Sequence, residues 1–194
     1  MPTVFVDIDT QLDFLYPAGA LYVPGAENIV PAIERLNRHA AAHGIPVIST
    51  TDAHAENDPE FTAWPPHCVA GTIGQHKPAG TLLEPRVVVP NSDDPLSIEG
   101  ARQILLEKQT TDAFQTRTLD RILEALRADR FVVYGVVTEI CVLAAARGLL
   151  KRGKQVVLLP DAVRALNEEK AGAAIEEVRR LGGQIAPIPD VLAG

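Results

Sequence analysis

Several polar side chains with reactive or metal-binding groups follow directly after short apolar runs of the sequence. These residues are Asp9, the pair Asp52 and His54, Lys108, and Cys141. In open α/β sheets a ligand site lies beyond the carboxyl ends of the strands. If the apolar runs form one parallel sheet, we therefore expect these residues to meet although they are far apart in the sequence.

Cys141 is the candidate nucleophile. It lies near the start of an expected helix, where free backbone amides and the helix dipole favour a thiolate. Asp9 could accept the thiol proton if burial raises its pKa, and Lys108 could hold that carboxylate. The alternative interpretation is structural, with Cys141 as a small buried side chain and Asp9 as a loop cap.

A second set of residues could bind a metal ion. Asp52 and His54 point the same way in an extended chain, and Glu60 and His67 follow on the same loop. Mixed oxygen and nitrogen ligands suit a divalent ion such as Zn, Mn or Fe. The alternative is a surface loop that carries acids and histidines by chance.

Trp64 lies close to His67 in the sequence, so its indole would sit beside this metal candidate. Together with Phe14, which follows the first apolar run, it could sandwich a flat aromatic substrate. The alternative is that Trp64 anchors the loop to the core.

The elements that must position these residues are strands and helices in alternation. Apolar runs rich in valine and isoleucine predict buried strands at residues 4–8, 46–50, 87–89, 104–106, 131–137, 156–159 and 185–188. Segments of helical period predict helices at residues 26–43, 118–128, 140–152 and 167–181. This alternation predicts a three-layer, doubly wound α/β fold with a mostly parallel sheet of about six strands and helices on both faces.

Length and composition predict a single domain over residues 1–194. The chain has 194 residues, of which 46% are hydrophobic and 22% charged, and this length is near the usual ceiling for one hydrophobic core. Residues 51–95 form a proline-rich stretch without clear periodicity. Such a long loop is typical of a functional segment, here for the metal and the substrate.

The charge pattern argues against nucleic acid and membrane partners. The net charge of −7 comes from 25 acidic and 18 basic residues that form no blocks. No apolar run reaches the roughly 20 residues that span a bilayer, and the N-terminus does not resemble a signal peptide. The two cysteines, Cys68 and Cys141, are expected to be free thiols. We therefore expect a cytoplasmic protein.

Taken together, these segments resemble the isochorismatase-like cysteine hydrolases and, within them, the nicotinamidases (pyrazinamidases). The resemblance extends from Val4 to about Pro187. Residues 9–14 match the opening D-x-Q-x-D-F, residues 108–114 match the lysine segment K-x-x-x-x-A-F, and residues 135–142 are similar to the nucleophile motif G-x-x-T-D-x-C-V. The string W-P-P-H-C-V-x-G-T-x-G at residues 64–74 is the most specific signal, because other branches of the superfamily generally lack this metal histidine.

The resemblance implies an amidohydrolase that converts nicotinamide to nicotinate and ammonia through a cysteine thioester, and that also accepts pyrazinamide. Asp9 would be the general base and acid, Lys108 its partner, and Cys141 the nucleophile. The backbone amides of Val137 and Cys141 would form the oxyanion hole, and the bond between Val137 and Thr138 would be a cis peptide.

The resemblance also implies one divalent metal ion and no organic cofactor. Zinc is the expected ion, with iron or manganese as alternatives. The implied ligands are Asp52, His54 and His67, with Glu60 as an acidic fourth ligand. The implied lining of the substrate ring pocket is Phe14, Leu21, Val23 and Trp64.

Two departures from the family pattern keep alternatives open. Glu139 replaces the usual aspartate of the nucleophile motif, and Ala53 follows Asp52 where an aromatic residue is common. Residues 55–61 also lack the usual histidine, which leaves the fourth metal ligand open. The alternatives are a related cysteine hydrolase that acts on another amide or ureido substrate, a non-catalytic metal- or ligand-binding module, and a thiol redox protein, which the lack of a C-x-x-C pair disfavours. The expected partners are a small carboxamide substrate and further copies of the same chain.

Overall fold

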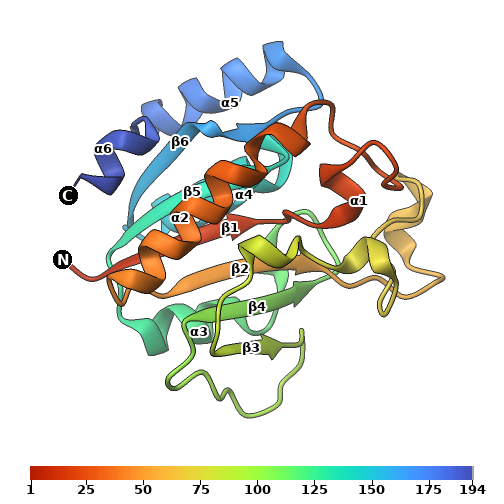
Figure 1. Cartoon of the computed structure of the whole chain (residues 1–194), viewed down its shortest axis with the longest axis horizontal. Helices are drawn as coiled ribbons and strands as arrows, with labels where there is room; N and C mark the ends of the chain where they lie inside the picture. Colours follow the sequence, from red (N-terminus) through yellow and green to blue (C-terminus); the bar gives the residue numbers. More distant parts are fainter. Residues whose placement is uncertain (194) are drawn as a thin grey trace.

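The computed structural model describes residues 1–193 and is built around one seven-stranded sheet (Figure 1). The strands are β1 (Thr3–Ile8), β2 (Val47–Asp52), β3 (Arg86–Val89), β4 (Gln103–Lys108), β5 (Arg130–Val136), β6 (Gln155–Arg164) and β7 (Gln184–Ile185). Their order is β3-β4-β2-β1-β5-β6-β7, and every pairing is parallel. The chain therefore begins at the centre of the sheet and builds first one half and then the other.

Helices cover both faces of this sheet. They are α1 (Leu12–Leu15), α2 (Val30–Ala42), α3 (Leu119–Leu126), α4 (Leu143–Lys151), α5 (Glu168–Arg180) and α6 (Ile188–Leu192). Helices α3, α4 and α5 pack on one face, and α1, α2 and α6 pack on the other, where α2 crosses in front of the strands in Figure 1. None of the described helices is long and apolar enough to cross a membrane.

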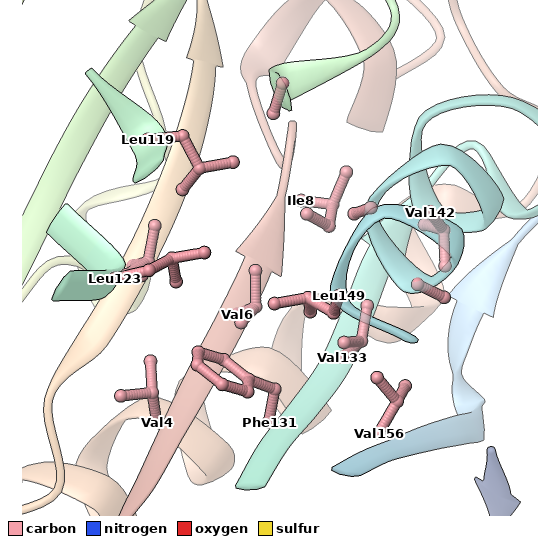
Figure 2. Close-up of a cluster of buried hydrophobic side chains, with 14 of the residues drawn as sticks. Val4, Val6, Ile8, Leu119, Leu123, Phe131, Val133, Val142, Leu149 and Val156 are labelled. Atoms are coloured by element: carbon pink, nitrogen blue, oxygen red, sulfur yellow. The ribbon is translucent and has the colours of Figure 1, made fainter. Parts of the chain in front are cut away.

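The strands are apolar on both faces because each face is buried. In β5, Phe131 and Val133 point into the cluster beneath α3 and α4, while Val132 and Tyr134 point into the cluster beneath α2. Figure 2 shows the first cluster, in which Phe131 and Val133 lie close to Leu149 of α4. This double burial explains why the strands appear in the sequence as continuous apolar runs.

The structure confirms the predicted α/β fold with a parallel sheet, and it has seven strands rather than about six. Two predicted helices differ at their starts: a 3₁₀-helix (Ala26–Ile29) precedes α2, and a π-helical turn (Thr138–Val142) precedes α4. Helices α1 and α6, each about one turn long, were not predicted. The strand predicted at residues 185–188 is wrong beyond Ile185, because β7 ends there and Ile188 begins α6. Between β2 and β3 the chain forms three short 3₁₀-helices, Pro59–Thr62, Ile73–Gln75 and Ala79–Thr81.

Candidate active site

The carboxyl ends of β4, β2, β1 and β5 lie side by side and bring the polar residues together. Asp9 follows β1, and Asp52 and Lys108 are the last residues of β2 and β4, where they are register partners. Cys141 lies in the π-helical turn after β5. Gly135 permits the close approach of β5 to β1, since its φ is +117° and a Cβ there would lie 2.1 Å from a β1 carbonyl oxygen.

Lys108 is buried between two carboxylates. Its Nζ lies 2.9 Å from Asp9 Oδ2, forms an ion pair with Asp52 Oδ1, and donates a hydrogen bond to the carbonyl oxygen of Thr110 at 3.0 Å. Burial alone would lower the pKa of Lys108, but the charges of Asp52 and Asp9 raise it well above its ordinary value. The ammonium group therefore stays charged, and these acceptors fix its position.

The two carboxylates beside Lys108 differ in pKa. Burial raises the pKa of Asp9 above its ordinary value, although the Lys108 charge and a 2.6 Å hydrogen bond from Thr50 Oγ1 oppose the shift. Burial would also raise the pKa of Asp52, but there the Lys108 charge and the neighbouring imidazoles of His54 and His67 lower it. Asp9 is therefore suited to exchange a proton, while Asp52 stays ionised.

The half-buried residue Cys141 lies beside these charges. Burial raises its pKa well above the ordinary value; the Lys108 charge opposes this shift, and the charges of Asp9 and Asp52 add to it. The start of a helix was expected to favour a thiolate, but Cys141 lies in the π-helical turn that leads into α4, and its pKa is shifted in the opposite direction. A base must remove the thiol proton, and Asp9 is the adjacent group that can accept it.

A cis peptide bond that does not involve proline precedes the nucleophile turn. It joins Val136 to Val137, one bond earlier than the Val137–Thr138 position that the resemblance implied. The carbonyl oxygen of Val137 accepts hydrogen bonds from the amides of Ile140 and Val142, each at 3.1 Å. These bonds fix the turn that carries the thiol.

Asp52, His54 and His67 form a buried group at the same edge of the sheet. One ligand atom from each residue lies within 4.8 Å of the other two. Asp52 Oδ2 is 3.7 Å from His54 Nε2 and 3.6 Å from His67 Nε2. The three atoms therefore converge closely enough to share one ion.

The Nε2 atoms of both histidines face that ion position. His67 Nδ1 lies 2.7 Å from the carbonyl oxygen of Pro65, so Nδ1 carries the proton and Nε2 holds the lone pair. His54 Nδ1 lies 3.1 Å from Asp58 Oδ2, without the geometry of a hydrogen bond. Both ring nitrogens of His54 are buried without a hydrogen-bond partner within residues 1–193, and Nε2 is the one that faces Asp52 Oδ2, at 3.7 Å. An ion held by these nitrogens and Asp52 would satisfy that atom, so the group fits a divalent metal.

Glu60 lies in the wall of the adjoining pocket, outside this group of three ligands. Burial and the Asp52 charge raise its pKa, and the His54 charge lowers it. Its role as a fourth ligand stays a prediction. The acid that contacts a histidine of the group is Asp58, which the sequence analysis missed. Asp58 Oδ1 also accepts the Glu60 N–H at 2.9 Å and so caps the 3₁₀-helix Pro59–Thr62. The same side chain therefore contacts both this helix and His54.

A pocket opens onto the Cys141 thiol. Its mainly apolar wall includes the full set that the resemblance implied for a substrate ring, namely Phe14, Leu21, Val23 and Trp64. Val137 and His67 are also in the wall, so the pocket extends from the thiol to the metal group. Three further lining residues were not predicted: Thr111, Ile140 and Leu166.

Two residues of the opening motif hold the site from outside the pocket. The Gln11 amide donates to the carbonyl oxygen of Asp52 at 2.8 Å and accepts from the Asp52 N–H at 2.7 Å. Asp13 Oδ2 accepts the N–H of Cys68 at 2.7 Å, which fixes the residue after His67. The motif at residues 9–14 includes both residues, but only the tertiary structure shows which groups they contact.

Comparisons with known proteins agree with this geometry. The isochorismatase domain family matches residues 3–190. The crystal structure of the pyrazinamidase of Pyrococcus horikoshii in complex with zinc is 30% identical, with a TM-score of 0.80 and coverage of 97% of this chain and 100% of that one. A pyrazinamidase/nicotinamidase from Streptococcus mutans UA159 is 29% identical, with a TM-score of 0.81 and coverage of 95% and 99%.

A relative with a different activity also matches. The N-carbamoylsarcosine amidase of an Arthrobacter species is 24% identical, over 79% of this chain and 56% of its own length. The relatives thus include more than one kind of amidase. Because the family match spans nearly the whole chain, this protein belongs to the isochorismatase family of hydrolases.

Proposed function

We propose that this protein is a nicotinamidase, which hydrolyses nicotinamide to nicotinate and ammonia and also accepts pyrazinamide. The observation that carries the proposal is a single pocket whose apolar wall holds Phe14 and Trp64 together with Cys141 and His67. Such a pocket suits a flat heteroaromatic ring whose carboxamide meets the thiol. The likeness to a pyrazinamidase and to a pyrazinamidase/nicotinamidase supports the same substrates.

Acylation begins with transfer of the Cys141 thiol proton to Asp9. The sulfur then forms a bond to the carboxamide carbon, and the carbonyl oxygen becomes an oxyanion. The backbone amides of Val137 and Cys141 donate hydrogen bonds to that oxygen. Asp9 gives the proton to the leaving nitrogen, ammonia departs, and a thioester remains.

Deacylation uses the same carboxylate as a base. Asp9 takes a proton from water while the water oxygen attacks the thioester carbonyl. The bond between carbon and sulfur breaks, nicotinate leaves, and the Cys141 sulfur regains a proton. Lys108, whose Nζ lies 2.9 Å from Asp9 Oδ2, holds the carboxylate in place through both halves of the reaction.

The group of Asp52, His54 and His67 would hold a divalent ion, for which we propose zinc, with Glu60 as a further ligand. The zinc complex of the Pyrococcus horikoshii relative supports this choice. A bound ion would supply a coordination point for the pyridine nitrogen, directly or through water, and so orient the ring. No organic cofactor is needed.

A second candidate is an amidase for a different amide or ureido substrate, which the likeness to N-carbamoylsarcosine amidase favours. The apolar pocket beside Trp64 argues for an aromatic substrate instead. A thiol redox function is disfavoured because Cys68 is buried and burial raises its pKa far above the ordinary value. A non-catalytic binding module is disfavoured because ligand binding alone does not require a carboxylate, an ammonium group and a thiol side by side, as Asp9, Lys108 and Cys141 are.

We also propose a cytoplasmic location. Cys68 and Cys141 are both free thiols. Free thiols persist in a reducing compartment, and the cytoplasm is such a compartment.

The experiment that tests the function is ammonia release from nicotinamide by the purified protein, with the metal content measured on the same sample. The Cys141→Ala variant should release none. Cys68→Ala is the matched control and should stay active, because Cys68 lies outside the pocket. If the wild type hydrolyses ureido compounds but not nicotinamide, the second candidate replaces the first.

A further inference from the structure

Glu139 links the nucleophile turn to a loop on the far side of the pocket. It lies two residues before Cys141, where the nucleophile motif has an aspartate. Its Oε1 accepts the N–H of Leu166 at 3.1 Å and the N–H of Asn167 at 2.8 Å. Both donors belong to the short connection between β6 and α5. One side chain therefore fastens this connection to the turn that carries the thiol.

Leu166 stands between two hollows of the surface. It lines the pocket at Cys141 and also an outer groove, and it shares both walls with Trp64 and Ile140. Ile140 belongs to the nucleophile turn, and the Trp64 N–H is bonded to the Glu60 carbonyl oxygen at 3.1 Å. Leu166, in contrast, is 39% exposed, so packing in the core does not hold it.

We propose that Glu139 is a positioning residue that sets the size limit of the substrate by holding Leu166 as the outer wall of the pocket. Two N–H groups that share one carboxylate oxygen make charge-assisted hydrogen bonds, which are stronger than bonds between neutral groups. Without them the exposed Leu166 side chain can swing away, and the pocket and the groove become one space. The excluded class is carboxamides whose ring carries a bulky substituent.

The inference rests on the proposed function only for its reference substrate, nicotinamide. The kinetic test compares kcat/KM for nicotinamide and for a phenyl-substituted nicotinamide. The ratio of the second to the first should rise on the order of tenfold in Glu139→Ala and in Leu166→Ala. Glu139→Gln keeps an accepting oxygen and should restore a ratio close to that of the wild type.

Glu177→Ala is the matched control for these variants. Glu177 is another carboxylate in the outer groove, but it pairs with Arg147 and does not contact the loop. This variant should leave both rate constants and their ratio close to the wild-type values.

A second readout does not depend on the substrate. The rates at which iodoacetamide and the bulkier N-phenylmaleimide label Cys141 are compared in a Cys68→Ala background. The ratio of bulky to small reagent should rise severalfold in Glu139→Ala and Leu166→Ala, and it should stay unchanged in Glu139→Gln and Glu177→Ala. If Glu139 only stabilises the fold, Glu139→Ala should lower the melting temperature without changing this labelling ratio.

Unchanged ratios in a folded Glu139→Ala variant would overturn the inference. If that variant does not fold, an unchanged ratio in Leu166→Ala has the same meaning. A failure of the proposed function looks different, because the wild type then releases no ammonia from nicotinamide while the labelling ratios still rise as expected.

Discussion

Replacement of Lys108 by methionine removes the buried ammonium group between Asp9 and Asp52 and keeps an unbranched side chain that is one atom shorter. At the 2.9 Å between Lys108 Nζ and Asp9 Oδ2, the attraction is about 6 kcal/mol with an effective dielectric constant of about 20. The Asp9 carboxyl can escape this loss by binding a proton. The net loss of stability should therefore be about 3–5 kcal/mol, as for other buried pairs that lose one partner.

The same proton uptake should damage the reaction. A protonated Asp9 cannot accept the Cys141 proton, so kcat/KM for nicotinamide should fall by about 10²–10⁴-fold, the usual value of a general base. The pH at which activity is half lost on the acidic side should also move upward, since Lys108 no longer opposes the effect of burial on the pKa of Asp9. Urea denaturation and ammonia release measure the two effects separately.

The double variant Lys108→Met with Asp9→Asn provides the control. It has no carboxyl group at position 9 that can lose its partner, but Asp52 still lacks its own. Part of the stability should therefore return, while activity should stay absent. Wild-type kcat/KM in Lys108→Met would refute the reasoning, and so would a double variant as unstable as the single one.

Three further predictions concern pH, the metal and a second buried pair. Asp9 must be ionised to act as a base, and its pKa is raised, so kcat/KM should fall on acidification at a pH above the value of about 4 for exposed aspartates. A pH–rate profile with its acidic limb at or below that value would contradict this. In His67→Ala the loss of a metal ligand should raise KM for nicotinamide by about 10–100-fold with less change in kcat. Steady-state kinetics with added zinc measure both constants, and an unchanged KM would argue against a metal ion that anchors the substrate ring. Lys77 Nζ lies 3.2 Å from Asp7 Oδ2 in the core, so Lys77→Met should cost about 3 kcal/mol in urea denaturation, whereas Lys77→Arg keeps the charge and should cost less.

Much of the fold and of the candidate site could be predicted because its signals are local. The strands are visible as apolar runs, since helices cover both faces of the sheet and no polar alternation interrupts them. Asp9, Asp52 and Lys108 each end or follow such a run. The convergence of strand ends in a parallel sheet then makes their meeting a consequence of the pattern.

The rest depended on distances through space. The sequence shows Asp58 and Leu166 as ordinary residues and Glu139 only as a departure from the nucleophile motif. Nothing local tells which backbone amide or histidine nitrogen such a side chain will face. The contact of Asp58 with His54 and the bonds of Glu139 to the loop of Leu166 exist only once segments far apart in the chain are packed together.

By itself, then, the sequence determined the parallel α/β fold, the family and the identity of the polar residues at the strand ends. Only the tertiary structure decided their protonation and their surroundings. The clearest case is Cys141, for which the local pattern predicted a thiolate while burial and the charges of Asp9 and Asp52 raise the pKa of the thiol. Desolvation is a property of everything packed around a group, so no local stretch of sequence can encode it.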